Sequence, residues 1–117
     1  MKILLTLLVL FLSSPLYSAE GDTYFCESTN LAQIKNGSTN EFRNEEFYFL
    51  RKKNKIEFVA EGFFKDHYMP VTYSLGEHFK GHYESQEVFM YIEGIFSYSA
   101  FGVSGEIVSM SANCKIK

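Results

Sequence analysis

The chain has 117 residues, enough for one folded domain, and its formal net charge is −3 at pH 7. A mildly acidic protein has no broad attraction for nucleic acid or anionic membranes, so we expect neither as a partner. Aromatic side chains are abundant, with 12 Phe and 8 Tyr but no Trp, and the two cysteines lie near opposite ends of the sequence.

Residues 1–19 have the order of a secretory signal peptide. Lys2 precedes an apolar run at 3–12, and the residues after it end in the small side chains of Ser18 and Ala19. The run is about half the roughly 20 residues that a membrane-spanning helix needs, which favours cleavage over an uncleaved anchor. We predict cleavage after Ala19, or after Ser18, leaving a single β domain at 20–117, periplasmic or secreted.

The first predicted strand, 23–35, is long and carries Cys26. Asn36-Gly37 follows it and is the strongest two-residue hairpin signal, so a strand bulged near Asn30 is favoured over a short helix. The residues before Cys26, Thr-Tyr-Phe, are unlike a lipoprotein signal. We therefore expect no stable membrane anchor after cleavage.

The middle of the chain predicts further short strands joined by turns. A segment ending in Phe47-Tyr48-Phe49-Leu50 leads into the polar turn 51–55. A strand at 56–60 then alternates, with Ile56 and Phe58 on one side. Residues 62–67 read as a connection, and 69–73 as a short strand that contains a proline.

The last third contains the clearest alternation. The segment 78–84 sets Phe79, Gly81 and Tyr83 opposite His78, Lys80 and His82. Apolar runs at 88–92 and 95–101 flank Glu93-Gly94, which suits a tight hairpin turn. The final strand, 106–115, follows a turn at 102–105 and carries Cys114 on its apolar face.

These elements predict an all-β domain of about seven or eight antiparallel strands, closed as a barrel or folded as a sandwich. Two cysteines in an exported chain most simply form a disulfide, and this one would join the first and last strands, Cys26 to Cys114. A free thiol or a metal ligand is the alternative, but neither cysteine has a second Cys or His within four residues.

No motif for catalysis, phosphate binding or a cofactor occurs in the sequence. The three histidines, His67, His78 and His82, lie within sixteen positions of one another. His78 and His82 would share one strand face but stand roughly 13 Å apart, too far to bind one ion together. A solvated strand face is favoured, and a small hydrolase with a site assembled around these histidines is the alternative.

One local cluster combines basic and aromatic side chains. The basic turn follows an aromatic segment directly, a composition typical of binding surfaces, and a solvated hairpin tip is the competing interpretation. The candidate partner-binding residues are Phe47, Tyr48, Phe49, Arg51, Lys52, Lys53 and Lys55. Consecutive aromatics place rings on both faces of their strands, so the surplus either fills the core or forms an exposed patch.

Four segments of the mature chain, "YFCE", "EEFYF", "GFF" and "VSMSANCK", resemble small exported proteins of marine bacteria. That resemblance implies kinship but no mechanism, because no function is assigned to the group. Tyr24-Phe25-Cys26 and Cys114 also resemble the frame of periplasmic inhibitors of C-type lysozyme, which are small β-barrels. Their Ser-Gly-x-x-Tyr-Ser loop is matched only by 104–109, without the tyrosine and closer to the C-terminus, so no functional residue carries over.

The sequence therefore predicts a non-enzymatic binding domain of the bacterial envelope, without metal or cofactor. Its partner would be a protein or an apolar small molecule. A purely structural envelope component is a further alternative.

Overall fold

The computed structural model describes residues 21–59, 63–64, 66–102 and 104–116. The predicted signal peptide lies outside them. Nine strands make up the described chain, and none of its residues belongs to a helix long and apolar enough to cross a membrane. The strands are β1 (Thr23–Lys35), β2 (Ser38–Glu41), β3 (Glu46–Arg51), β4 (Lys55–Val59), β5 (Tyr68–Leu75), β6 (His78–Tyr83), β7 (Glu87–Ile92), β8 (Ile95–Phe101) and β9 (Ile107–Ile116).

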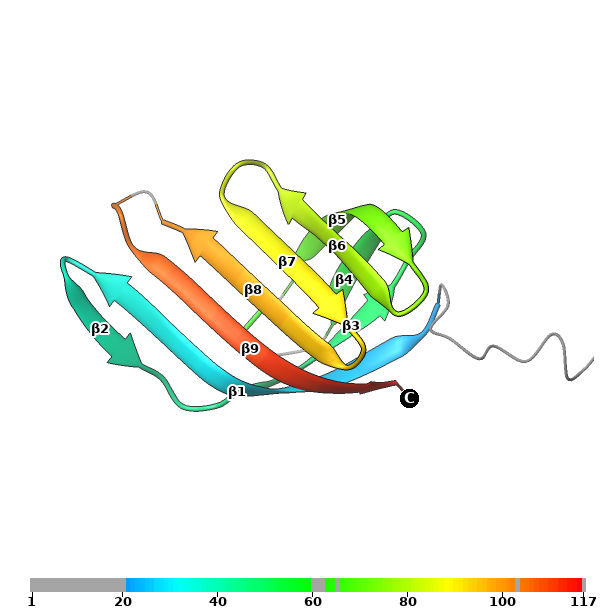
Figure 1. Ribbon diagram of the computed structural model, residues 1–117, viewed down its shortest axis with the longest axis horizontal. Coiled ribbons are helices and arrows are strands. Elements are labelled where there is room, and N and C mark those ends of the chain that lie inside the picture. Colours follow the sequence, from blue (N-terminus) through cyan, green and yellow to red (C-terminus); the bar gives the residue numbers. More distant parts are fainter. Residues whose placement is uncertain (1–20, 60–62, 65, 103, 117) are drawn as a thin grey trace, which may run out of the picture.

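The strands form one closed antiparallel barrel. The sheet order is β2-β1-β3-β4-β5-β6-β7-β8-β9, and the additional pairing of β1 with β9 closes a ring of eight strands (Figure 1). This decides between the two predicted architectures in favour of the barrel. The first strand has the predicted bounds 23–35, and the predicted bulge lies between Ser28 and Asn30.

The ninth strand, β2, lies outside the ring. β1 pairs with β3 through Thr23–Glu27 and with β2 through Ala32–Lys35, while β9 runs along nearly all of β1. In Figure 1, β2 and the second half of β1 therefore extend to one side of the barrel. All four β2 residues are exposed, so this polar strand had no apolar alternation that could predict it.

Two-residue turns set the hairpin registers. Asn36-Gly37 and Glu93-Gly94 have positive φ at both positions, as the primed turns that match the twist of antiparallel strands require. Lys35 consequently faces Ser38, and Ile92 faces Ile95. Both turns were predicted from the sequence.

The predicted disulfide fastens the seam where the ring closes. Cys26 and Cys114 face each other directly in the β1–β9 ladder, with their Cα atoms 4.0 Å apart. The Cys114 amide donates to Gly94 on the other side, so the two cysteines form the closer, non-hydrogen-bonded type of cross-strand pair. The described chain has no free cysteine.

Aromatic rings fill the barrel interior. A connected set of rings from β1, β3, β4 and β6–β8 stacks edge to face or in parallel, including Tyr24, Phe49, Phe58, Phe79, Phe89, Tyr91 and Phe96. Phe64, from the connection after β4, adds a ring 4.2 Å from Phe58 at one barrel end. Both interpretations of the aromatic surplus therefore hold in part. Many of the Phe and Tyr rings fill the core, and the remaining ones lie outside it.

Candidate interaction face

The predicted basic and aromatic cluster does not form one surface. Phe47 and Phe49 point into the core and are 1% and 0% exposed, because alternate residues of β3 share the inward face. Arg51 continues that inward series and is 6% exposed. In this fold these three side chains are therefore buried and do not belong to the exposed surface, contrary to what a contact through them requires.

Arg51 instead closes the barrel end at the β3–β4 turn. Its guanidinium lies 4.7 Å from the ring centroid of Phe79, and Nη2 donates to Ser74 Oγ at 2.8 Å. Nη1 donates to the backbone carbonyls of Lys52 and Lys53. Both the charge and the hydrogen-bond donors of Arg51 are thus used inside the structure.

The other predicted residues are at the surface but are separated. Tyr48 is half-buried on the outer face of β3, with its ring centroid 5.0 Å from that of Phe25. Lys52 and Lys53 are exposed in the turn. Lys55 pairs with Glu57 at 3.3 Å. The basic residues therefore form a solvated turn, and the rings of Phe47 and Phe49 are not exposed beside it.

The histidines also lie in different places. His78 and His82 point outward from β6 and are exposed, whereas His67 lies at the opposite barrel end from Arg51. His67 Nε2 approaches both carboxylate oxygens of Glu87, at 2.9 and 3.0 Å. In the described part of the chain, no His, Cys, Asp and Glu side chains gather into a group that could hold a metal ion.

Glu87, the first residue of β7, has a carboxylate that is largely shielded from solvent. Its side chain is 16% exposed, and Tyr98 donates a hydrogen bond of 2.5 Å to Oε2. Burial and the Glu87 carboxylate together raise the pKa of the Tyr98 phenol far above its ordinary value. His67, Glu87 and Tyr98 therefore tie the β4–β5 connection to β7 and β8.

The most unusual surface is the outer face of β5, β7 and the start of β8. The outer face of a barrel in water normally carries polar side chains, yet every outward side chain of β7 is apolar. The apolar face consists of Tyr73, Leu75, Val88, Met90, Ile92 and Ile95, each between 41% and 68% exposed. Because the closed barrel has no second sheet layer, nothing in the described structure covers these side chains.

Register brings the apolar face together across neighbouring strands. Ile92 faces Ile95 on β8 and His78 on β6, which in turn faces Leu75 on β5. One row further along the strands, Met90 lies between Lys80 and Ser97. The face is therefore continuous over four strands, with β6 contributing a basic stripe inside it.

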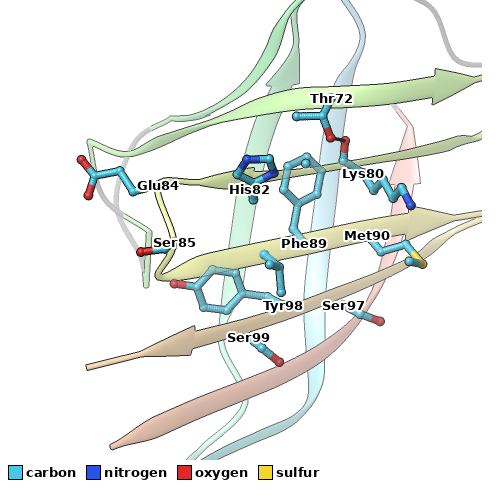
Figure 2. Close-up of a pocket in the computed structure, with 12 residues that line it drawn as sticks. Thr72, Lys80, His82, Glu84, Ser85, Phe89, Met90, Ser97, Tyr98 and Ser99 are labelled. Atoms are coloured by element: carbon cyan, nitrogen blue, oxygen red, sulfur yellow. Dashed lines mark hydrogen bonds between the residues drawn. The ribbon is translucent and has the colours of Figure 1, made fainter. Parts of the chain in front are cut away.

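Two shallow hollows lie on this surface. The larger, of about 570 Å³, extends over β5–β8 and includes Lys80, His82, Met90 and Ser97 in its lining (Figure 2). The smaller, of about 170 Å³, is lined by Tyr73, His78, Phe79, Lys80, Met90 and Ile92. Lys80 and Met90, which Figure 2 shows on adjacent strands, line both hollows.

A signal for this face was present in the sequence. The run Val88-Phe89-Met90-Tyr91-Ile92 is apolar without a break, so both faces of its strand must be apolar. In the structure, Phe89 and Tyr91 occupy the interior, and the other three side chains lie outside. No family model, curated protein or solved structure matches the chain, so the geometry alone supports the choice of this face.

Proposed function

We propose that the protein is a non-enzymatic binding domain of the bacterial envelope that contacts a protein partner through the apolar face. The observation that carries the proposal is the outward apolar stripe of β7, which has Val88, Met90 and Ile92 exposed together. Contiguous exposed apolar surface of this kind typically marks an interaction site.

The packed interior favours a surface site over a ligand in the barrel lumen. An eight-stranded barrel has room for either side chains or one small ligand. Here large rings, including the fully buried Tyr24, Phe49 and Phe96, occupy that space. A protein partner therefore fits the geometry better than an enclosed apolar small molecule.

The proposed location rests on two features. The first 19 residues have the order of a signal peptide, and the Cys26–Cys114 disulfide is compatible with an oxidising compartment. We place the protein in the periplasm or outside the cell.

The test is affinity capture from an envelope extract with three matched baits. The baits are the wild-type protein, the face variant Val88→Ser/Met90→Ser/Ile92→Ser, and the control variant Ile34→Ser/Phe42→Ser. The control removes two side chains of similar exposure, 44% and 47%: Ile34 lies on β1, which β8 and β9 separate from β7, and Phe42 follows β2 and donates its amide to Leu31 of β1. We expect quantitative mass spectrometry to find a protein enriched at least about tenfold by the wild type and the control relative to the face variant. If no protein distinguishes the face variant, the proposal is wrong.

A further inference from the structure

The surface around the apolar face is segregated by charge. The chain contains 14 Asp and Glu residues, yet β5, β6, β8 and β9 contain none. The one carboxylate of β7, Glu87, is held by His67 and Tyr98 at the barrel end. Acidic residues near this surface occupy the turns, as Glu77, Glu84 and Glu93 do.

Lys80 places an ammonium group among these strands, and the larger hollow that it lines also includes Glu84 from the turn between β6 and β7. Lys80 lies on β6 between Tyr73 of β5 and Met90 of β7, which directly face it in the two ladders. Its Nζ is 5.7 Å from the Tyr73 ring centroid. Among the described residues, no carboxylate lies within the 4.0 Å ion-pair distance of Lys80, whereas His78 Nε2 is 3.7 Å from Glu93.

Any partner that covers the apolar face also removes water from Lys80. Burying an unpaired charge is costly, and an ion pair offsets the cost only when an opposite charge arrives with good geometry. A second copy of the chain is a poor occupant, because β5, β6 and β8 of its own face carry no carboxylate and the one carboxylate of β7, Glu87, is held by His67 and Tyr98. A partner that is apolar except for one acidic group would pack against Met90 and pair its carboxylate with Lys80.

We propose that the partner is a protein segment that presents an Asp or Glu side chain to Lys80, flanked by apolar side chains that pack on β7. This inference rests on the proposed function and specifies its partner. The stripe from Val88 to Ile92 is roughly 13 Å long, the length of a short extended segment. The outward hydroxyls of Ser97 and Ser99 on β8 add hydrogen-bonding groups along the far side of the stripe.

The test is a selection of random 12-residue peptides, displayed on phage, against the immobilised exported protein with its disulfide intact. We expect the enriched peptides to combine at least two large apolar residues with one Asp or Glu. Selection against Lys80→Glu should enrich Lys or Arg at the acidic position instead, because the charge at the centre of the face is reversed.

One enriched peptide is then synthesised and measured by titration calorimetry. Lys80→Gln in the protein, or Asp→Asn (or Glu→Gln) in the peptide, should each weaken binding at least about tenfold. The two changes together should cost little more than either alone, as expected for one paired interaction. Unchanged melting temperatures of Lys80→Gln and Met90→Ser, both exposed in the wild type, confirm that the variants fold.

The outcomes separate this inference from the proposed function. Loss of peptide binding in Met90→Ser but not in Lys80→Gln overturns the carboxylate pairing and leaves the face as a binding surface. Peptide binding that survives Met90→Ser overturns both proposals. Enrichment of acid-free peptides, or no enrichment at all, overturns the carboxylate pairing, as does Lys80-dependent binding to phosphatidylglycerol vesicles without any selected peptide.

Discussion

Removal of the Cys26–Cys114 disulfide should cost a large share of the stability of the barrel. The bond joins residues 88 positions apart. In the chain-entropy model a loop of this length lowers the entropy of the unfolded chain by about 15 cal/mol/K, or about 4–5 kcal/mol at 25 °C. Small domains are stable by only about 5–15 kcal/mol, so Cys26→Ala/Cys114→Ala should be only marginally folded at 37 °C.

The assay is guanidinium unfolding of the oxidised wild type, the reduced wild type and the double alanine variant. We expect the reduced protein and the variant to lose similar free energy. Their m-values should rise, because an unfolded chain without the cross-link exposes more surface. A loss below about 1 kcal/mol, or unchanged m-values, would show that the disulfide does not act mainly on the unfolded state.

Three further predictions concern single positions. Gly81→Ala should destabilise by about 1–3 kcal/mol in urea unfolding, because its new Cβ would lie 1.8 Å from the Pro70 carbonyl oxygen; a neutral result contradicts that contact. Arg51→Ala should cost about 2–3 kcal/mol while Lys53→Ala changes stability by less than about 0.5, and equal effects would contradict the structural role of Arg51. Tyr98→Phe should cost about 1–2 kcal/mol at pH 8, since it removes the hydrogen bond to Glu87. The folded-state pKa of Tyr98 is raised, so this contribution is complete below about pH 10 and is lost as the pH rises further; wild type and Tyr98→Phe should therefore converge in unfolding titrations above pH 10.

Local sequence signals predicted most of the fold. The turn residues Asn36-Gly37 and Glu93-Gly94 predicted where two hairpins reverse direction. The alternation of apolar and polar residues after Lys55 predicted which side chains point inward. These local signals did not predict closure, for which the predicted Cys26–Cys114 disulfide was the signal in the sequence. Closure depends on the pairing of β1 with β9, two segments at opposite ends of the chain, and alternation reports which face is inward but not which strand lies alongside.

The candidate site was predicted less well, for a reason visible in β3. Phe47, Phe49 and Arg51 lie at alternate positions, so once Phe47 points inward the other two must follow. Their basic and aromatic composition suggested a contact surface, but alternation decided their environment. The same alternation rule, applied to the unbroken apolar run of β7, requires exposed apolar side chains at Val88, Met90 and Ile92. These three side chains are exposed in the structure.

Site-specific photocrosslinking in the living cell would show whether the outward face of β7 contacts a partner. A benzophenone amino acid would replace Met90 in one variant and Asn40, an exposed residue of β2, in another. We expect a discrete protein adduct from position 90 that is absent at position 40 and lost when Val88→Ser and Ile92→Ser are added. Equal adducts from both positions, or none from position 90, would contradict this expectation.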